Sequence, residues 1–255
     1  MTYSPQTLTA KENTLFAALA RKAEFRGRLY RDGVPTPAAY LAQRVRVLFV
    51  FREPNMRGNP YALDMRDEVH DERFRPLGRD RTRQDRSLKC WWNAKAGMYA
   101  HAVAAALEGE PAKKAFGRFS QGGWNYEVVN RFGYIQIKKI GGAGTSNAAE
   151  LRTHAMKYAD LLQKQVRLYR PHLILGCGVG GGSPAQLMAA HVLPDGHRQR
   201  TEKSGATWWQ FSAASRPRAL VQLWHPARRG DRWTRYQDVW ASVREVARTV
   251  GLGQG

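Results

Sequence analysis

Glu53 and His225, two residues that could carry out acid–base chemistry, each follow closely on a run of apolar residues, at 45–51 and at 219–224. A carboxylate can orient a water molecule and partly deprotonate it, and an imidazole can donate a proton to an oxyanion that develops across a pocket. We therefore consider Glu53 and His225 as candidates for general acid–base catalysis at one site.

Both residues also have a purely structural interpretation. Glu53 could form a surface ion pair with Arg52 or Arg57, and His225 could belong to a turn that ends a strand. Each interpretation is as good as the catalytic one when the residue is considered alone. The placement of both residues after apolar runs favours the catalytic interpretation, although the sequence leaves the alternatives open.

Four short apolar runs predict the strands that must position these residues. They cover residues 45–51, 132–137, 172–175 and 219–224, and each is nearly continuous in apolar side chains, which is typical of central strands covered on both faces. Helical periodicity is found at 11–28, with Thr9 as its cap, and at 91–107, 146–169 and 236–250. This alternation predicts one α/β domain over residues 1–255, a three-layer α/β/α sandwich around a four-stranded parallel sheet. The tryptophan-rich stretch 207–211 is expected to add a core strand, with an interface as the alternative.

A basic insert at 56–89 interrupts this pattern, because it has no sustained periodicity. The chain carries 41 Lys and Arg against 21 Asp and Glu, a net charge of +20, which favours a polyanionic partner, nucleic acid first. We expect the insert, with Arg79, Arg81 and Arg83 at its centre, to lie along a phosphate backbone; a solvated surface loop is the alternative.

Ligands of open parallel sheets bind outside the carboxyl ends of the strands, so the segments that follow the four strands should form one rim. One of these segments, Gly176-x-Gly178-x-x-Gly181, also matches the dinucleotide-binding pattern. A tight turn or a close backbone approach explains the same glycines, and a dinucleotide-dependent enzyme is kept as an alternative. The 2 cysteines and 7 histidines show no metal-ligand spacing, so we expect no metal and no cofactor. The chain has no apolar stretch long enough for a membrane span and no secretory signal, so we expect a cytoplasmic protein without a membrane partner.

The order of these residues resembles the uracil-DNA glycosylase superfamily. The likeness depends on Glu53-Pro54 after the first strand, Gln136 in the second, Gly176 after the third and His225-Pro226-Ala227 after the fourth. That superfamily has a three-layer α/β/α fold, an acidic or amide residue before a proline in its first motif, and His-Pro-Ser or His-Pro-Ala in its last. The likeness covers residues 44–60, 131–178 and 218–247, under half of the chain.

The resemblance implies a role for each matching residue. Glu53 falls where the superfamily has its water-activating Asp or Asn, and His225 falls on the histidine that stabilises the departing base. Gln136 lies where many members read the edge of the base with an Asn, and Arg229 lies where a loop wedges into the minor groove. The residues expected to contact or stack on the base are Asn55, Gln136, Phe51, Tyr61 and Phe74. Those expected to bind DNA are Arg52, Lys138, Lys139, Arg228, Arg229, Arg79, Arg81 and Arg83.

Two departures from the superfamily pattern bear on the substrate. Asn55 stands where the uracil-specific branch has a Tyr that blocks 5-substituents, and Gln136 is one methylene longer than Asn. The resemblance therefore implies a monomeric DNA glycosylase for a modified or bulky pyrimidine in double- or single-stranded DNA, which suits a role in defence against modified phage DNA. A non-catalytic nucleic-acid-binding module is the main alternative, and a lyase that uses Lys138 or Lys139 is another.

Overall fold

The protein has an α/β architecture built on a mixed, six-stranded sheet of order β4-β2-β5-β8-β7-β6. The computed structural model describes residues 3–53, 63–66, 95–121, 126–141, 147–212 and 217–252. The strands of the sheet are β2 Val47–Phe51, β4 Gly133–Gln136, β5 Leu173–Cys177, β6 His197–Arg200, β7 Thr207–Gln210 and β8 Ala219–Leu223. A separate two-stranded parallel sheet pairs β1 Tyr30–Arg31 with β3 Leu63–Asp64.

The four strands predicted from the apolar runs are neighbours and are parallel. β2 pairs with β4 on one side and with β5 on the other, and β5 pairs with β8. The predicted sheet of four strands is nevertheless too small, because β7 and β6 continue it in the antiparallel sense. The expectation of a core strand at 207–211 is confirmed, since Trp208 and Trp209 of β7 are buried.

Strand β6 was missed because all four of its residues are exposed. An edge strand pairs on one side only, and this one carries polar side chains on both faces, so no apolar pattern marks it. Its charged residues Arg198 and Arg200 are of the kind that prevents further strand addition at an edge.

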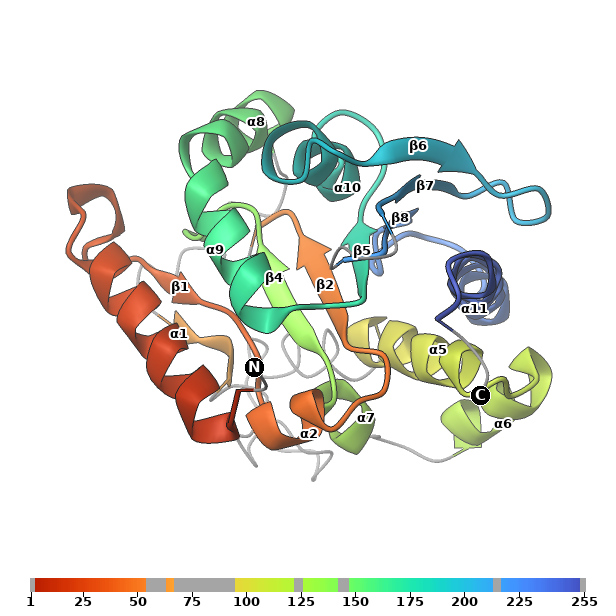
Figure 1. Cartoon of the computed structure of the whole chain (residues 1–255). Helices are drawn as coiled ribbons and strands as arrows, with labels where there is room; N and C mark the ends of the chain where they lie inside the picture. The colour runs from red at the N-terminus through yellow and green to blue at the C-terminus, as the bar shows by residue number, and fades with distance from the viewer. Residues whose placement is uncertain are drawn as a thin grey trace, which may run out of the picture.

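Helices cover both faces of the sheet (Figure 1). They are α1 Pro5–Ala20, α2 Pro37–Leu41, α5 Gly97–Leu107, α6 Ala112–Gln121, α7 Tyr126–Asn130, α8 Ala148–Lys157, α9 Ala159–Tyr169, α10 Pro184–Leu187 and α11 Arg232–Thr249, with short turns η1 Ala23–Phe25 and η4 Met188–Val192. Alternate side chains of a strand point to opposite faces. Accordingly, Phe49 of β2 packs in a cluster with α5 and α11, whereas Leu48 packs in a second cluster with α9 and α10.

The predicted helices have different bounds in the structure, where α5 spans Gly97–Leu107 and α11 begins at Arg232 instead of residue 236. α1 begins at Pro5 instead of residue 11, because Ser4 caps it by accepting a hydrogen bond from the Thr7 N–H at 3.1 Å, and proline at the first position needs no donor. The helix predicted over 146–169 is broken at Tyr158, whose φ of −114° and ψ of 22° are not helical, and this gives α8 and α9. Asn147 caps α8, because its Oδ1 accepts hydrogen bonds from the N–H groups of Ala149 and Glu150. Among the described helices, none is long and apolar enough to cross a membrane.

Candidate functional site

The carboxyl ends of the four parallel strands form one rim, and both candidate acid–base residues lie on it. Glu53 comes two residues after β2 ends at Phe51, and His225 comes two residues after β8 ends at Leu223. β5 lies between these strands, and the Gly178 N–H donates to the Leu223 carbonyl at 2.8 Å, which ties the loop after β5 to the end of β8. With neighbouring strands about 4.8 Å apart, the ends of β2 and β8 are separated by roughly 10 Å.

Arg52 connects the two sides of this rim. Its guanidinium donates from Nη2 to the Val179 carbonyl at 2.6 Å, in the loop after β5. A Cβ at Gly178 would lie 3.0 Å from Arg52 Nε, and Gly178 has a φ of +141°, so only glycine fits beneath the arginine. Gly176 likewise lets the first turn of α10 approach, since a Cβ there would lie 2.5 Å from the Ala185 backbone nitrogen. Close packing thus accounts for these two glycines of the dinucleotide-like pattern.

The environment of His225 favours a neutral ring with a defined tautomer. Nδ1 accepts a hydrogen bond from the Ala227 N–H at 3.2 Å, so the ring proton belongs on Nε2. Burial, together with the positive charges of Arg52 and Lys95, lowers the pKa of His225 to about 4. At neutral pH the ring is therefore uncharged and can donate a hydrogen bond from Nε2.

Glu53 belongs to an ion-pair chain that the sequence did not indicate. Its Oε2 lies 3.0 Å from Nζ of Lys138, and the same ammonium lies 2.6 Å from Oε1 of Glu150 on α8. The side chains of Glu53 and Lys138 are both 6% exposed, whereas that of Glu150 is 46% exposed. The expected surface pair with Arg52 is not what the structure shows, because the Lys138 side chain reaches Glu53 from the next strand.

Neither of the tandem lysines is an open phosphate contact, so the expectation that they bind DNA is wrong. Burial lowers the pKa of Lys138, but the hydrogen bonds to Glu150 and Glu53 outweigh this and leave its pKa raised. Lys139 is 1% exposed and pairs with the fully buried Asp32 at 2.5 Å. Charges buried in this way need their partners, so both lysines are structural charges first.

The two base-contact candidates on the strands differ in their surroundings. Phe51 is 2% exposed, and its ring stacks with Phe49 and Tyr134 inside the core, so the interpretation of Phe51 as an open stacking surface is wrong. Gln136, its partner on β4, is also buried, and its Oε1 has no hydrogen-bond partner among the residues that the structure describes. The backbone N–H of Gln136 donates to Asp32 at 2.6 Å, which fixes the end of β4. Gln136 thus presents a fixed amide with hydrogen-bonding capacity to spare.

The turn after β8 is basic and more open. Arg229 is exposed, and Arg228 is half-buried, 3.3 Å from Asp238 of α11. The Arg228 guanidinium also lies over the ring of Trp224, 4.5 Å from its centroid. Trp224 is 48% exposed, although the sequence suggested only the last residue of a strand. Its position directly before His225 is the signal that could have singled it out.

Several predicted site residues cannot be placed. Asn55, Tyr61, Phe74, Arg79, Arg81 and Arg83 lie outside the described residues, as does most of the insert at 56–89. The part of the insert that is described contradicts a phosphate-binding role for Arg66. Arg66 pairs with Asp64 at 2.5 Å and with the buried Glu12 at 2.9 Å, so it fastens this segment to α1.

His154 is a further titratable residue near the ion-pair chain. It lies one helical turn after Glu150 on α8, and its Nδ1 is buried without a hydrogen-bond partner in the described part of the chain. Burial lowers its pKa, and the charge of Lys138 lowers it further. The sequence did not indicate His154 as a site residue, because the groups that surround a helical histidine in space cannot be inferred from its neighbours along the chain.

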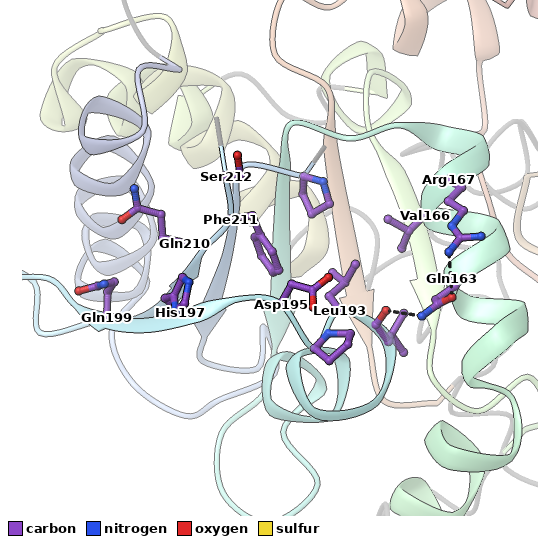
Figure 2. A pocket seen from close by; sticks show the side chains of 13 residues that line it. Gln163, Val166, Arg167, Leu193, Asp195, His197, Gln199, Gln210, Phe211 and Ser212 are labelled. Atoms are coloured by element: carbon purple, nitrogen blue, oxygen red, sulfur yellow. Dashed lines mark hydrogen bonds between the residues drawn. The ribbon is translucent and has the colours of Figure 1, made fainter. Parts of the chain in front are cut away.

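A cavity of about 630 Å³ lies apart from the rim, between α9, the loop after η4, the edge strand β6 and its neighbour β7 (Figure 2). Asp195, His197, Phe211 and Arg167 contribute to its lining, but none of the candidate site residues does. Among the described residues, no group of three or more His, Cys, Asp or Glu side chains could hold a metal ion.

Comparisons of the chain with family models, with curated proteins and with solved structures found no match. The chemistry of the rim must therefore be interpreted from its own residues. It combines a buried carboxylate beside an ammonium, a neutral imidazole that can donate from Nε2, and exposed cations. These groups can polarise a water on one side of a substrate and stabilise negative charge on the other.

Proposed function

We propose that the protein is a monofunctional DNA glycosylase that hydrolyses the N-glycosidic bond of a flipped-out, modified pyrimidine. The observation that carries the proposal is that Glu53 and His225, 172 positions apart, end two parallel strands on the same rim. The three-layer arrangement, the order of the strand-end motifs and the resemblance to the uracil-DNA glycosylase superfamily support it. We further propose that the protein acts as a monomer in the cytoplasm.

In the proposed reaction, Glu53 stabilises the positive charge that develops on the sugar, and His225 stabilises the negative charge that develops on the base. As the glycosidic bond breaks, the bonding electrons leave with the base, and the sugar becomes an oxocarbenium-like cation. Glu53 stabilises this cation and accepts a proton from the water whose oxygen bonds to C1′. Nε2–H of His225 donates a hydrogen bond to the departing anionic base. The base then takes up a proton from solvent.

The state of the two lysines favours hydrolysis over lyase chemistry. An imine requires a neutral, accessible amine, and Lys138 has a raised pKa and is held between two carboxylates. Lys139 is buried against Asp32. Lys138 instead pairs with Glu53, 3.0 Å from its Oε2. Borohydride should therefore trap no adduct between the protein and its substrate DNA.

The substrate class follows from Asn55 and Gln136. By the resemblance, Asn55, which lies outside the described residues, replaces a tyrosine that blocks 5-substituents, and Gln136 is one methylene longer than the asparagine that reads the base edge. We propose a 5-substituted cytosine or a related modified pyrimidine as the substrate, and a role in removing bases from modified phage DNA. Cleavage of uracil-containing DNA alone would contradict this part of the proposal.

The decisive experiment compares Glu53→Gln with Glu150→Gln, since both carboxylates contact the same ammonium. Oligonucleotides that carry uracil, thymine or bulky 5-substituted cytosines are incubated with each protein, and abasic sites are revealed by alkaline cleavage. We expect Glu53→Gln to lower the rate by roughly 10²- to 10⁴-fold with DNA binding retained, and Glu150→Gln to change it only a few fold. Equal effects of both variants would contradict a catalytic Glu53.

A non-catalytic nucleic-acid-binding module is the second candidate, and the Glu53–Lys138 ion pair favours it, because that pair gives Glu53 a structural role. In that case the wild-type protein forms no abasic sites on any of these DNAs. Its binding falls steeply with salt and is unchanged in Glu53→Gln.

A further inference from the structure

Trp224 is the most exposed aromatic side chain among the described residues. It is 48% exposed, and the only other large apolar side chain found exposed in the described part of the chain is Met156 on α8. Trp224 follows the last residue of β8 and directly precedes His225. Its place on the rim, directly before His225, makes this exposed ring available to a ligand of the site.

The ring of Trp224 is held in place from one side. The Arg228 guanidinium lies 4.5 Å from the ring centroid, and Arg228 is itself 3.3 Å from Asp238. The turn between them is also fixed. The Arg228 N–H donates to the His225 carbonyl at 2.9 Å, and Arg235 donates to the carbonyls of Arg228 and Pro226 at 2.9 and 3.2 Å. An aromatic ring fixed in this way loses little conformational entropy when a planar group stacks on it.

Cations flank this ring on the same rim. Arg229 is exposed one residue beyond Arg228, and Arg52 and Lys95 are close enough to His225 to act on its charge. An aromatic surface among cations is the combination that binds single-stranded nucleic acid, since bases stack on the ring and phosphates meet the positive charges. An intact duplex keeps its bases stacked on each other and offers no free base face to such a ring.

We propose that Trp224, backed by Arg228, is a stacking platform for an unpaired nucleobase of DNA that is single-stranded or locally opened at the rim. The base stacks on the indole as the outer member of an arginine–tryptophan–base sandwich. This deepens the proposed function by naming the form of the DNA, and it depends on DNA being the partner. It does not depend on catalysis by Glu53.

The test measures the affinity of the full-length protein for two fluorescein-labelled single strands by anisotropy, a ten-nucleotide oligothymidine and a strand of equal length whose residues are abasic. We expect Trp224→Ala to weaken binding to oligothymidine about tenfold and to leave binding to the abasic strand within twofold of wild type. Trp224→Phe should restore most of the loss, because a phenyl ring still stacks. Equal losses on both strands, or no loss on either, would overturn the proposal.

A second pair of variants separates stacking from charge. Arg228→Ala and Arg244→Ala each remove one arginine that lies over a tryptophan, since Arg244 lies 4.9 Å from the ring centroid of Trp240 on α11. We expect Arg228→Ala to weaken binding to oligothymidine more than Arg244→Ala does. Equal effects would mean that only net charge matters, which would overturn the platform.

The outcomes also distinguish this proposal from the proposed enzyme. If the wild-type protein forms no abasic sites but Trp224→Ala still binds oligothymidine selectively worse than wild type does, the platform stands and the glycosylase fails. If Glu53→Gln abolishes abasic-site formation while Trp224→Ala binds both strands like wild type, the glycosylase stands and the platform fails.

Discussion

The charged side chains in the two halves of the rim differ in burial and in pairing. The closed half, beside β2 and β4, holds its charged side chains in ion pairs and consists of Glu53, Lys138, Glu150, Asp32 and Lys139. The open half, after β8, presents an exposed indole and an exposed arginine and consists of Trp224, His225, Arg228 and Arg229. Each half contains a pair of adjacent basic residues, Lys138-Lys139 or Arg228-Arg229, and the two pairs look alike in the sequence.

The difference shows what burial demands of a charge. A buried ammonium keeps its charge only beside a carboxylate, and in the closed half each lysine has one. In the open half, Arg229 is exposed to water and pairs with no acidic side chain among the residues that the structure describes, which leaves its charge available to a phosphate. We therefore expect the closed half to govern stability and the position of Glu53, and the open half to govern binding.

The largest effect is expected from breaking the pair between Lys139 and Asp32. In Lys139→Met the Asp32 carboxylate is left buried, although it keeps the hydrogen bonds from the Gln136 N–H and from Gln165. We expect the free energy of unfolding, measured in urea, to fall by about 3–5 kcal/mol. Lys139→Met with Asp32→Asn should recover part of this loss. A loss below about 1 kcal/mol in Lys139→Met would contradict the importance of the closed half.

A smaller effect is expected on the titration of His225. Because its pKa of about 4 in the folded protein lies below the ordinary value of 6.5, the unfolded chain binds this proton first as the pH falls. The contribution of His225 to stability is thus fully present above pH 6.5 and is lost as the pH falls towards 4. It also follows that activity should show no loss from His225 protonation between pH 7 and 5.

The variant Arg52→Gln tests how far the charge of Arg52 lowers the pKa of His225. Removing the nearby positive charge should raise the pKa of His225, and burial, the larger cause, should still hold it below 6.5. Histidine ring signals followed by NMR over pH 3 to 8 would measure this. Arg198→Gln, on the exposed edge strand β6, is the control that should leave the His225 pKa unchanged. An unchanged pKa of His225 in Arg52→Gln would contradict an electrostatic interaction between Arg52 and His225.

The smallest effect is expected from an exposed arginine of the open half. Arg229→Ala should leave the free energy of unfolding within about 0.5 kcal/mol of wild type. It should lower the slope of log affinity for DNA against log salt by about one, as expected for one lost phosphate contact. Lys113→Ala, an exposed lysine on α6, should not change that slope. The same slope change in both variants would mean that the charge acts without a defined contact.

Much of the fold was predictable because burial on both faces leaves a local trace. The runs at 45–51, 132–137, 172–175 and 219–224 were predicted as strands, and each overlaps one of the four parallel strands, although β5 continues two residues further, to Cys177. The exposed strand β6 and the break at Tyr158 were not predictable, because neither depends on an apolar pattern. Glycines that allow close packing, such as Gly176, were correctly taken as compatible with a backbone approach.

The candidate site was predictable only as a set of strand ends. Parallel strands carry their carboxyl ends to the same edge, so the placement of Glu53 and His225 on one rim follows from the strand order. The ion-pair chain did not follow, because Lys138 reaches Glu53 from the end of β4, and Glu150 reaches Lys138 from α8. Lys138 and Lys139 look equivalent in the sequence, and only their surroundings show that they pair with different carboxylates.

The sequence by itself determined the alternation of strands and helices, the excess of positive charge and the residue types at the strand ends, because these are properties of local pattern and composition. The tertiary structure decided which charges are buried in pairs and which stay open, because the pairing of ionised groups depends on distances between segments far apart in the chain. Packing between segments far apart in the chain also left the ring of Trp224 exposed beside His225 and buried Phe51 in the core.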